Sequence, residues 1–224
     1  MPVGRYHDGR SAVLEFVARR AVTAADGRRA LVAIDGVDGA GKSVFADALA
    51  TWMRAQGRPV IRASADDFHH RRGVRYRRGR DSPEGFWRDS FDYETLRKEL
   101  LEPLRPEGSG RYRCAAHDLM TDERLDLPWE SAPHDAVLVL DGLFLHRDEL
   151  VDLWDFSVLL EVPFTVSVPR MAIRDDTSPH PEHPSLVRYV QGQRLYFAAC
   201  SPRDRADVVI DNADWNHPTV VSAR

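Results

Sequence analysis

The residues with the clearest chemical meaning form one glycine-rich segment, Gly36-Val37-Asp38-Gly39-Ala40-Gly41-Lys42-Ser43. It matches the pattern G-x-x-x-x-G-K-[ST], in which the glycines let the backbone curl until several N–H groups point at one anion. Lys42 should then reach the β- and γ-phosphates of ATP and act in catalysis, and the Ser43 hydroxyl should ligate Mg²⁺. Because an apolar run precedes the segment and a helical pattern follows it, the sequence predicts a phosphate-binding loop.

A carboxylate follows a second apolar run later in the chain. The run Val137-Leu138-Val139-Leu140 ends directly at Asp141. A carboxylate at the end of a buried strand can hold Mg²⁺ beside the phosphate loop, either directly or through a water. The alternative is that Asp141 only caps the turn that it forms with Gly142. The sequence favours the metal role, so Ser43 and Asp141 are the predicted magnesium ligands.

Short apolar runs alternate with helical patterns along most of the chain. This order predicts an α/β fold of three layers, a P-loop NTPase with a mostly parallel sheet and helices on both faces. The five predicted strands are 30–34, 60–63, 136–140, 156–162 and 207–210. The predicted helices are 11–25, 43–56, 92–104, 147–153, 165–174 and 185–199. The pattern predicts irregular structure for residues 64–92 and a small β-hairpin for residues 111–127.

Composition limits the class of protein and its partners. The chain has 224 residues, a formal net charge of −4 and two cysteines, Cys114 and Cys200. This length suits a single domain over residues 1–224. No apolar stretch is long enough to span a bilayer, and residues 1–10 lead into no signal-peptide core. We therefore expect a cytoplasmic protein with reduced thiols and with no membrane or nucleic-acid partner. Assembly into a homo-oligomer is possible on this composition.

Patterns typical of other nucleotide-binding classes are absent, because neither N-K-x-D nor L-S-G-G-Q occurs. Between residues 31 and 214 the chain instead resembles the uridine kinase and phosphoribulokinase family, especially the uridine kinase-like proteins of bacteria. The resemblance rests, in order, on Gly36 to Ser43, Ala65-Asp66-Asp67-Phe68, Asp89-Ser90-Phe91-Asp92-Tyr93, Val139-Leu140-Asp141-Gly142, Arg170-Met171-Ala172-Ile173-Arg174-Asp175 and Arg205-Ala206-Asp207-Val208-Val209-Ile210.

The resemblance implies roles for one acidic pair and one arginine pair. Asp66 matches the family's carboxylate beside the acceptor hydroxyl, where it would act as the base, and Asp67 would help through Mg²⁺. Arg170 and Arg174 match arginines of a helical lid, at about 163–184, that hold the phosphates. The alternatives are a turn cap for Asp66 and a solvated helix face for the arginines. The loop 212–214 matches the family's adenine-contacting segment.

The acceptor positions, in an insertion at about 66–130, depart from the family pattern. Phe86 stands where a ribose-binding aspartate is expected, so Glu84 or Asp89 would have to replace it. His117 and Asp122 stand at the positions of a base-reading tyrosine and histidine. The resemblance therefore implies an ATP-dependent small-molecule kinase whose acceptor is nucleoside-like, with His117 and Asp67 among its contacts. A sugar or vitamin acceptor, and a nucleotide-binding regulatory protein without transfer, are the alternatives.

Two further groups of residues receive structural interpretations. Six arginines lie between Arg71 and Arg80, and we interpret them as a solvated loop that partly lines the cleft, with nucleic-acid binding as the alternative. Tyr189, Gln193 and Tyr196 share one face of a predicted helix, and we expect them to pack there.

Overall fold

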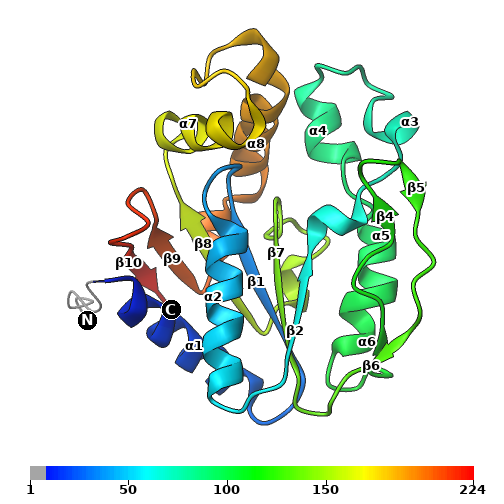
Figure 1. Cartoon of the computed structure of the whole chain (residues 1–224), viewed down its shortest axis with the longest axis vertical. Helices are drawn as coiled ribbons and strands as arrows, with labels where there is room; N and C mark the ends of the chain where they lie inside the picture. The colour runs from blue at the N-terminus through cyan, green and yellow to red at the C-terminus, as the bar shows by residue number, and fades with distance from the viewer. Residues whose placement is uncertain (1–8) are drawn as a thin grey trace.

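A computed structural model describes residues 9–224, so the expectation that residues 1–10 are no signal peptide falls largely outside the described chain. The described part is built on a six-stranded sheet with the order β10-β9-β8-β1-β7-β2 (Figure 1). Its strands are β1 (Ala30–Gly36), β2 (Val60–Ser64), β7 (Val137–Gly142), β8 (Phe156–Glu161), β9 (Val208–Asp211) and β10 (Thr219–Ala223). Every pairing in this sheet is parallel except the last, between β9 and β10.

The central strands are apolar because both of their faces are covered. Every residue of β1 and β7 is buried. Leu31 and Leu138 point into the core on one face, whereas Val32 and Val139 point into the core on the other. This alternation is what a parallel sheet between two layers of helices requires, and it confirms the predicted three-layer α/β architecture.

Helices cover both faces and the edge of the sheet where the parallel strands end. They are α1 (Arg10–Ala25), α2 (Lys42–Ala55), α3 (Arg72–Arg75), α4 (Pro83–Asp89), α5 (Tyr93–Leu96), α6 (Glu102–Leu104), α7 (Phe164–Asp175), α8 (Val187–Cys200) and α9 (Pro202–Arg205), with shorter or irregular turns η1 (Ala65–Phe68), η2 (Arg97–Leu101), η3 (Val151–Leu153) and η4 (Pro184–Leu186). In Figure 1, α7 and α8 lie beyond the carboxyl end of β1, and α3 and α4 lie across from them. None of the helices among residues 9–224 is long and apolar enough to cross a membrane.

The sheet has one strand more than the sequence predicts. The sixth strand, β10, is short, lies at the sheet edge and has no buried residue. An edge strand of this kind shows no apolar run, so periodicity does not reveal it. The five predicted strands are all present.

The insertion also differs in detail from its prediction. In place of one hairpin over 111–127, two small antiparallel pairs form, β3 (Arg111–Tyr112) with β6 (Glu130–Ser131) and β4 (His117–Asp118) with β5 (Glu123–Arg124). The segment 64–92 is not irregular throughout, because Ser82 accepts a hydrogen bond from Gly85 N and caps α4. Of the predicted helix 147–153, only the short turn η3 at its end forms.

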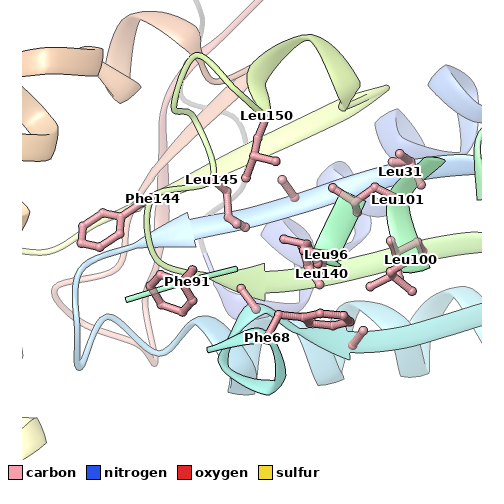
Figure 2. Close-up of a cluster of buried hydrophobic side chains, with 14 of the residues drawn as sticks. Leu31, Phe68, Phe91, Leu96, Leu100, Leu101, Leu140, Phe144, Leu145 and Leu150 are labelled. Atoms are coloured by element: carbon pink, nitrogen blue, oxygen red, sulfur yellow. The ribbon is translucent and has the colours of Figure 1, made fainter. Parts of the chain in front are cut away.

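One aromatic side chain joins the sheet to the helices beyond its edge. Phe144 is fully buried, and its ring centroid lies 5.0 Å from that of Trp87 and 5.1 Å from that of Tyr196. Figure 2 shows Phe144 near the end of the strand that carries Leu140. Its φ of 66° is unusual for a bulky residue, so surrounding contacts must hold this turn in place.

We therefore expect Phe144→Ala to lower the free energy of unfolding by about 3–5 kcal/mol, since it empties a buried aromatic site. Urea unfolding followed by circular dichroism measures the change. Met120→Ala is the control, because the Met120 side chain is 84% exposed, and it should change the value by less than about 0.5 kcal/mol. A loss below about 1 kcal/mol for Phe144→Ala would show that the aromatic cluster does not secure this turn.

Candidate active site

The phosphate loop has the conformation that its glycines predict. It connects the end of β1 to the first residue of α2, and Gly39 and Gly41 adopt φ values of 74° and 87°. A Cβ atom at Gly39 would lie 2.2 Å from the Ser167 carbonyl oxygen, so only glycine lets α7 pack this closely on the loop. Lys42 Nζ donates a hydrogen bond to the Val37 carbonyl at 2.9 Å, which holds the ammonium over the curl of the loop.

Two buried amide side chains from distant parts of the chain hold the loop. The Asp38 N–H donates to Gln193 Oε1 of α8 at 2.8 Å, and Asn212 Nδ2 donates to the Ala40 carbonyl at 2.7 Å. The packing role expected for Gln193 is therefore incomplete, because it also positions the loop. No local pattern relates positions 155 residues apart, so only the fold reveals the contact.

A buried polar network lies directly behind the loop. The Asp35 carboxylate accepts hydrogen bonds from Gly36 N at 2.7 Å, from His146 Nδ1 at 2.8 Å and from the Tyr196 hydroxyl at 2.5 Å. Burial raises the pKa of Tyr196 well above its ordinary value, and the Asp35 charge adds to the rise. No sequence pattern marks Asp35 or His146 as site residues, and the helical spacing of Tyr196 predicts only packing. The network ties β1, the turn after β7 and α8 to the start of the loop.

The two predicted magnesium ligands meet at the loop. Ser43 Oγ donates to Asp141 Oδ2 at 2.6 Å, because β7 runs beside β1 and places Asp141 opposite Ile34. The other oxygen, Asp141 Oδ1, is buried and accepts no hydrogen bond, although Arg62 Nη2 lies 2.7 Å away as an ion-pair partner. A hydroxyl and a carboxylate with spare electron pairs suit Mg²⁺, which takes few protein ligands and completes its shell with phosphate and water.

Asp66 and Asp67 lie on η1, directly after β2 and beside this pair. A Cβ atom at Gly142 would lie 2.5 Å from Ala65 Cβ, so glycine allows the end of β7 to approach η1. Partial burial raises the pKa of Asp67, and the charges of Asp66 and Asp141 raise it further. The Asp66 charge also adds to the raised pKa of Asp38 in the phosphate loop, after burial as the main cause.

The two arginines predicted to hold phosphates have different surroundings. Arg174 forms a bidentate pair with Asp175, with both distances 2.7 Å. Hydrogen bonds with Asp175 are the first cause of its raised pKa, and the charges of Asp38 and Asp66 add to the rise. Arg170 instead donates to the Asn212 and Ala213 carbonyls at 3.2 and 2.5 Å. Arg170 thus fastens the C-terminal segment, because its donors are already used there.

The two carboxylates suggested as replacements for a ribose-binding aspartate have other partners. Asp89 is 1% exposed and pairs with Arg77 and with Arg78, whose Nε lies 2.8 Å from Asp89 Oδ2. Glu84 lies on the surface of α4 and pairs with Arg88 at 3.1 Å. The structure therefore gives Asp89 a role in anchoring the loop before α4, and it leaves Glu84 in a surface ion pair.

His117 lines a pocket of about 280 Å³ beside η1. His69, which also lines it, has its Nδ1 atom 2.7 Å from the Asp66 carbonyl, and burial lowers its pKa. The Ala116 N–H donates to the Asp67 carbonyl at 3.0 Å, so the pocket and the Asp66–Asp67 pair share one wall. A second pocket, of about 200 Å³, lies at the start of α2 between Val44, Asn212 and Trp215.

The Asp38 carboxyl gives a test of this electrostatic arrangement. Burial raises its pKa above the ordinary 3.8, Lys42 opposes the rise, and Asp66 adds to it. The folded chain therefore holds this proton more tightly than the unfolded chain does, so ionised Asp38 destabilises the fold. Stability is lost as the pH rises from about 3.8 through the raised pKa.

We expect Asp38→Asn to raise the unfolding free energy of the nucleotide-free protein at pH 7 by on the order of 1 kcal/mol. The gain should shrink as the pH falls toward 4, where the wild-type carboxyl becomes protonated. Urea unfolding at pH 7, 5.5 and 4 measures it, with Asp152→Asn at an exposed position as the control. A gain that does not depend on pH would contradict the assignment.

The fold is shared with known structures, although no protein-family model and no curated protein matches the chain. A Bacillus stearothermophilus protein described as a candidate uridine kinase aligns with a TM-score of 0.70 at 24% identity, over 88% of this chain and 96% of that one. A candidate fructose transport system kinase from a Silicibacter species aligns with a TM-score of 0.65 at 23% identity, over 84% of this chain and 95% of that one. The D-glycerate 3-kinase of Cryptococcus neoformans aligns with a TM-score of 0.60 at 12% identity, over 90% of this chain and 96% of that one. The chain thus shares its three-layer fold with these proteins.

Proposed function

We propose that this chain is an ATP-dependent small-molecule kinase of the uridine kinase and phosphoribulokinase family. One arrangement carries the proposal: β2 runs beside β7 and leads into Asp66 on η1, next to the pair that Ser43 and Asp141 form at the phosphate loop. A protein that only binds a nucleotide needs no carboxylate facing the end of the phosphate chain. The shared fold with proteins described as kinases supports the same conclusion.

The nucleotide would lie along the start of α2. The pocket between Val44, Asn212 and Trp215 would receive the base, and the backbone N–H groups of the loop would hold the phosphates. Ser43 and Asp141 would hold Mg²⁺, which neutralises charge on the phosphates. Lys42 would leave the Val37 carbonyl and turn to the β- and γ-phosphates, exchanging one oxygen partner for a charged one.

The residues of the chain account for each change in bonding. The acceptor hydroxyl oxygen forms a bond to the γ-phosphorus while the bond from that phosphorus to the bridging oxygen breaks, and ADP leaves. The hydroxyl proton passes to Asp66. Lys42 and Arg174 offset the negative charge on the transferred group. Gln193 and Asn212 keep the loop in place, so little reorganisation is needed as the charge moves.

The acceptor proposed first is a nucleoside-like molecule, as the family resemblance implies, and a sugar or a vitamin is the alternative. We also propose a cytoplasmic location, which the free thiols of Cys114 and Cys200 support.

The decisive experiment measures ADP release with ATP and Mg²⁺ in the presence and absence of a panel of nucleosides, sugars and vitamins. An acceptor that raises the rate supports the kinase. A rate that no acceptor changes supports instead a regulatory protein that binds nucleotide without transferring phosphate.

Two variants separate phosphate binding from transfer. Lys42→Ala should abolish turnover, because it removes the charge that reaches the β- and γ-phosphates. Asp66→Asn should leave the Kd for ATP within about two-fold and lower the rate of transfer by about 10²-fold or more, the size of a general-base contribution. Single-turnover kinetics and nucleotide titration measure the two effects. An unchanged rate for Asp66→Asn would remove this carboxylate from the mechanism.

The two arginines of α7 should also behave differently. Arg174→Gln should lower kcat by about 10²-fold, since it removes a positive charge that would offset the negative charge on the transferred group. Arg170→Gln should mainly raise the KM for ATP and lower the Tm, because its guanidinium holds the segment at Asn212 and Ala213. Steady-state kinetics and thermal unfolding of both variants measure the contrast. Equal losses of kcat would mean that both arginines contact the phosphates.

A further inference from the structure

One arginine lies against the predicted magnesium ligand Asp141, and the proposed reaction does not use it. Arg62 is the charged residue of β2, which pairs with β7 so that Arg62 stands opposite Val139, two residues before Asp141. Arg62 Nη2 lies 2.7 Å from Asp141 Oδ1, and the two side chains are only 19% and 3% exposed. Because the pair is largely buried, dissolved salt screens it little.

The guanidinium of Arg62 is held through all three of its nitrogen atoms. Nε donates to Asp47 Oδ1 of α2 at 2.8 Å, and Nη1 donates to the Ala63 and Val139 carbonyls. Nη2 remains for the ion pair with Asp141. The side chain thus joins β2, β7 and α2, and it can leave Asp141 only by breaking these bonds.

The two oxygens of Asp141 therefore have separate partners. Oδ1 faces Arg62, and Oδ2 accepts a hydrogen bond from Ser43 Oγ at 2.6 Å. A Mg²⁺ ion held by Ser43 and Asp141 would share this carboxylate with a guanidinium of the same sign. Like charges repel, and the repulsion is strong where little water lies between them. Arg62 therefore lowers the affinity of Asp141 for a bare metal ion.

The rest of the site offers a bare metal ion few ligands. Within residues 9–224, no group of three or more His, Cys, Asp or Glu side chains is arranged to hold a metal. Mg²⁺ is usually bound through one or two carboxylates together with waters and substrate phosphates. The nucleotide would supply the ligands that the chain lacks, and its negative charge would offset the repulsion from Arg62.

We propose that Arg62 is a positioning residue that holds Asp141 in a permanent ion pair, so that the site takes Mg²⁺ only together with the nucleotide phosphates. The ion pair keeps one carboxylate oxygen turned towards Ser43 and prevents a bare cation from occupying the empty site. Arginine suits this task because it is always charged and reaches several acceptors with a planar, rigid fork. The inference rests on the proposed kinase function and concerns its metal, not its acceptor.

The test is thermal unfolding of the full chain without nucleotide, in about 10 mM MgCl₂ and in NaCl of equal ionic strength. The Tm of the wild type should differ by less than about 1 °C between the two buffers. Arg62→Gln leaves Asp141 as a buried carboxylate without a counter-charge, which lowers the Tm in NaCl. Mg²⁺ should then bind Asp141 and raise the Tm of this variant by about 3–6 °C, the shift for a ligand at about ten times its Kd.

Matched variants separate this charge effect from a loss of packing. Arg62→Lys keeps the charge and loses the fork, so its Tm should fall without any response to Mg²⁺. Arg54→Gln is the control, because Arg54 is an exposed arginine of α2 that donates to the Val60 carbonyl, and it should respond as the wild type does. Combining Arg62→Gln with Asp141→Asn removes both charges and should abolish the response to Mg²⁺.

The outcomes separate this inference from the kinase proposal. A Tm of Arg62→Gln that does not respond to Mg²⁺, or an equal response in the wild type, overturns the inference. If Arg62→Gln does not fold, the double variant decides. A folded double variant supports the ion-pair role, whereas an unfolded one shows that the guanidinium serves packing alone and overturns it. None of these measurements involves an acceptor or turnover, so a failed search for an acceptor leaves them standing, and a negative result at Arg62 leaves the kinase standing.

Discussion

The structure depends on one geometric constraint: the neighbouring parallel strands β2, β7 and β1 end at the same edge of the sheet. β1 ends in the phosphate loop, β7 ends in Asp141, and β2 ends beside Asp66. The contact of 2.6 Å between Ser43 and Asp141 joins two of these ends directly. Because parallel strands present their carboxyl ends together, groups far apart in the sequence converge without any special loop.

The helices beyond that edge keep the phosphate loop in place rather than only covering it. Gln193 and Tyr196 of α8 reach the loop and the network behind it, and Asn212 holds the loop from the other side. In each contact a buried side chain donates or accepts a hydrogen bond, and breaking that bond without a replacement costs energy. A loop held in this way can bind phosphate without first becoming ordered, so less binding energy is lost on ordering.

Charge is distributed unevenly between the two sides of the cleft. Asp38, Asp66, Asp67 and Asp141 gather near the loop, and burial and mutual repulsion raise the pKa values of Asp38 and Asp67. Such an arrangement requires cations, and a nucleotide with Mg²⁺ would supply one beside Lys42. Across η1, the pocket lining carries two guanidinium groups, of Arg71 and Arg124, against one carboxylate, that of Asp92. The two regions thus suit two different ligands.

The sequence alone determined the five central strands and the phosphate loop, because an apolar run beside a glycine-rich anion motif is a local signal. It therefore predicted these strands and a carboxylate, Asp141, at the end of β7, whereas the role of Asp66 came from the family resemblance. Only the tertiary structure decided which charged groups are free. Asp89 and Arg170 resemble site residues in sequence, but the fold supplies them with partners, namely Arg77 and Arg78 for the first and backbone carbonyls for the second. Partners of this kind lie up to 43 residues away, and a linear pattern holds no information about them.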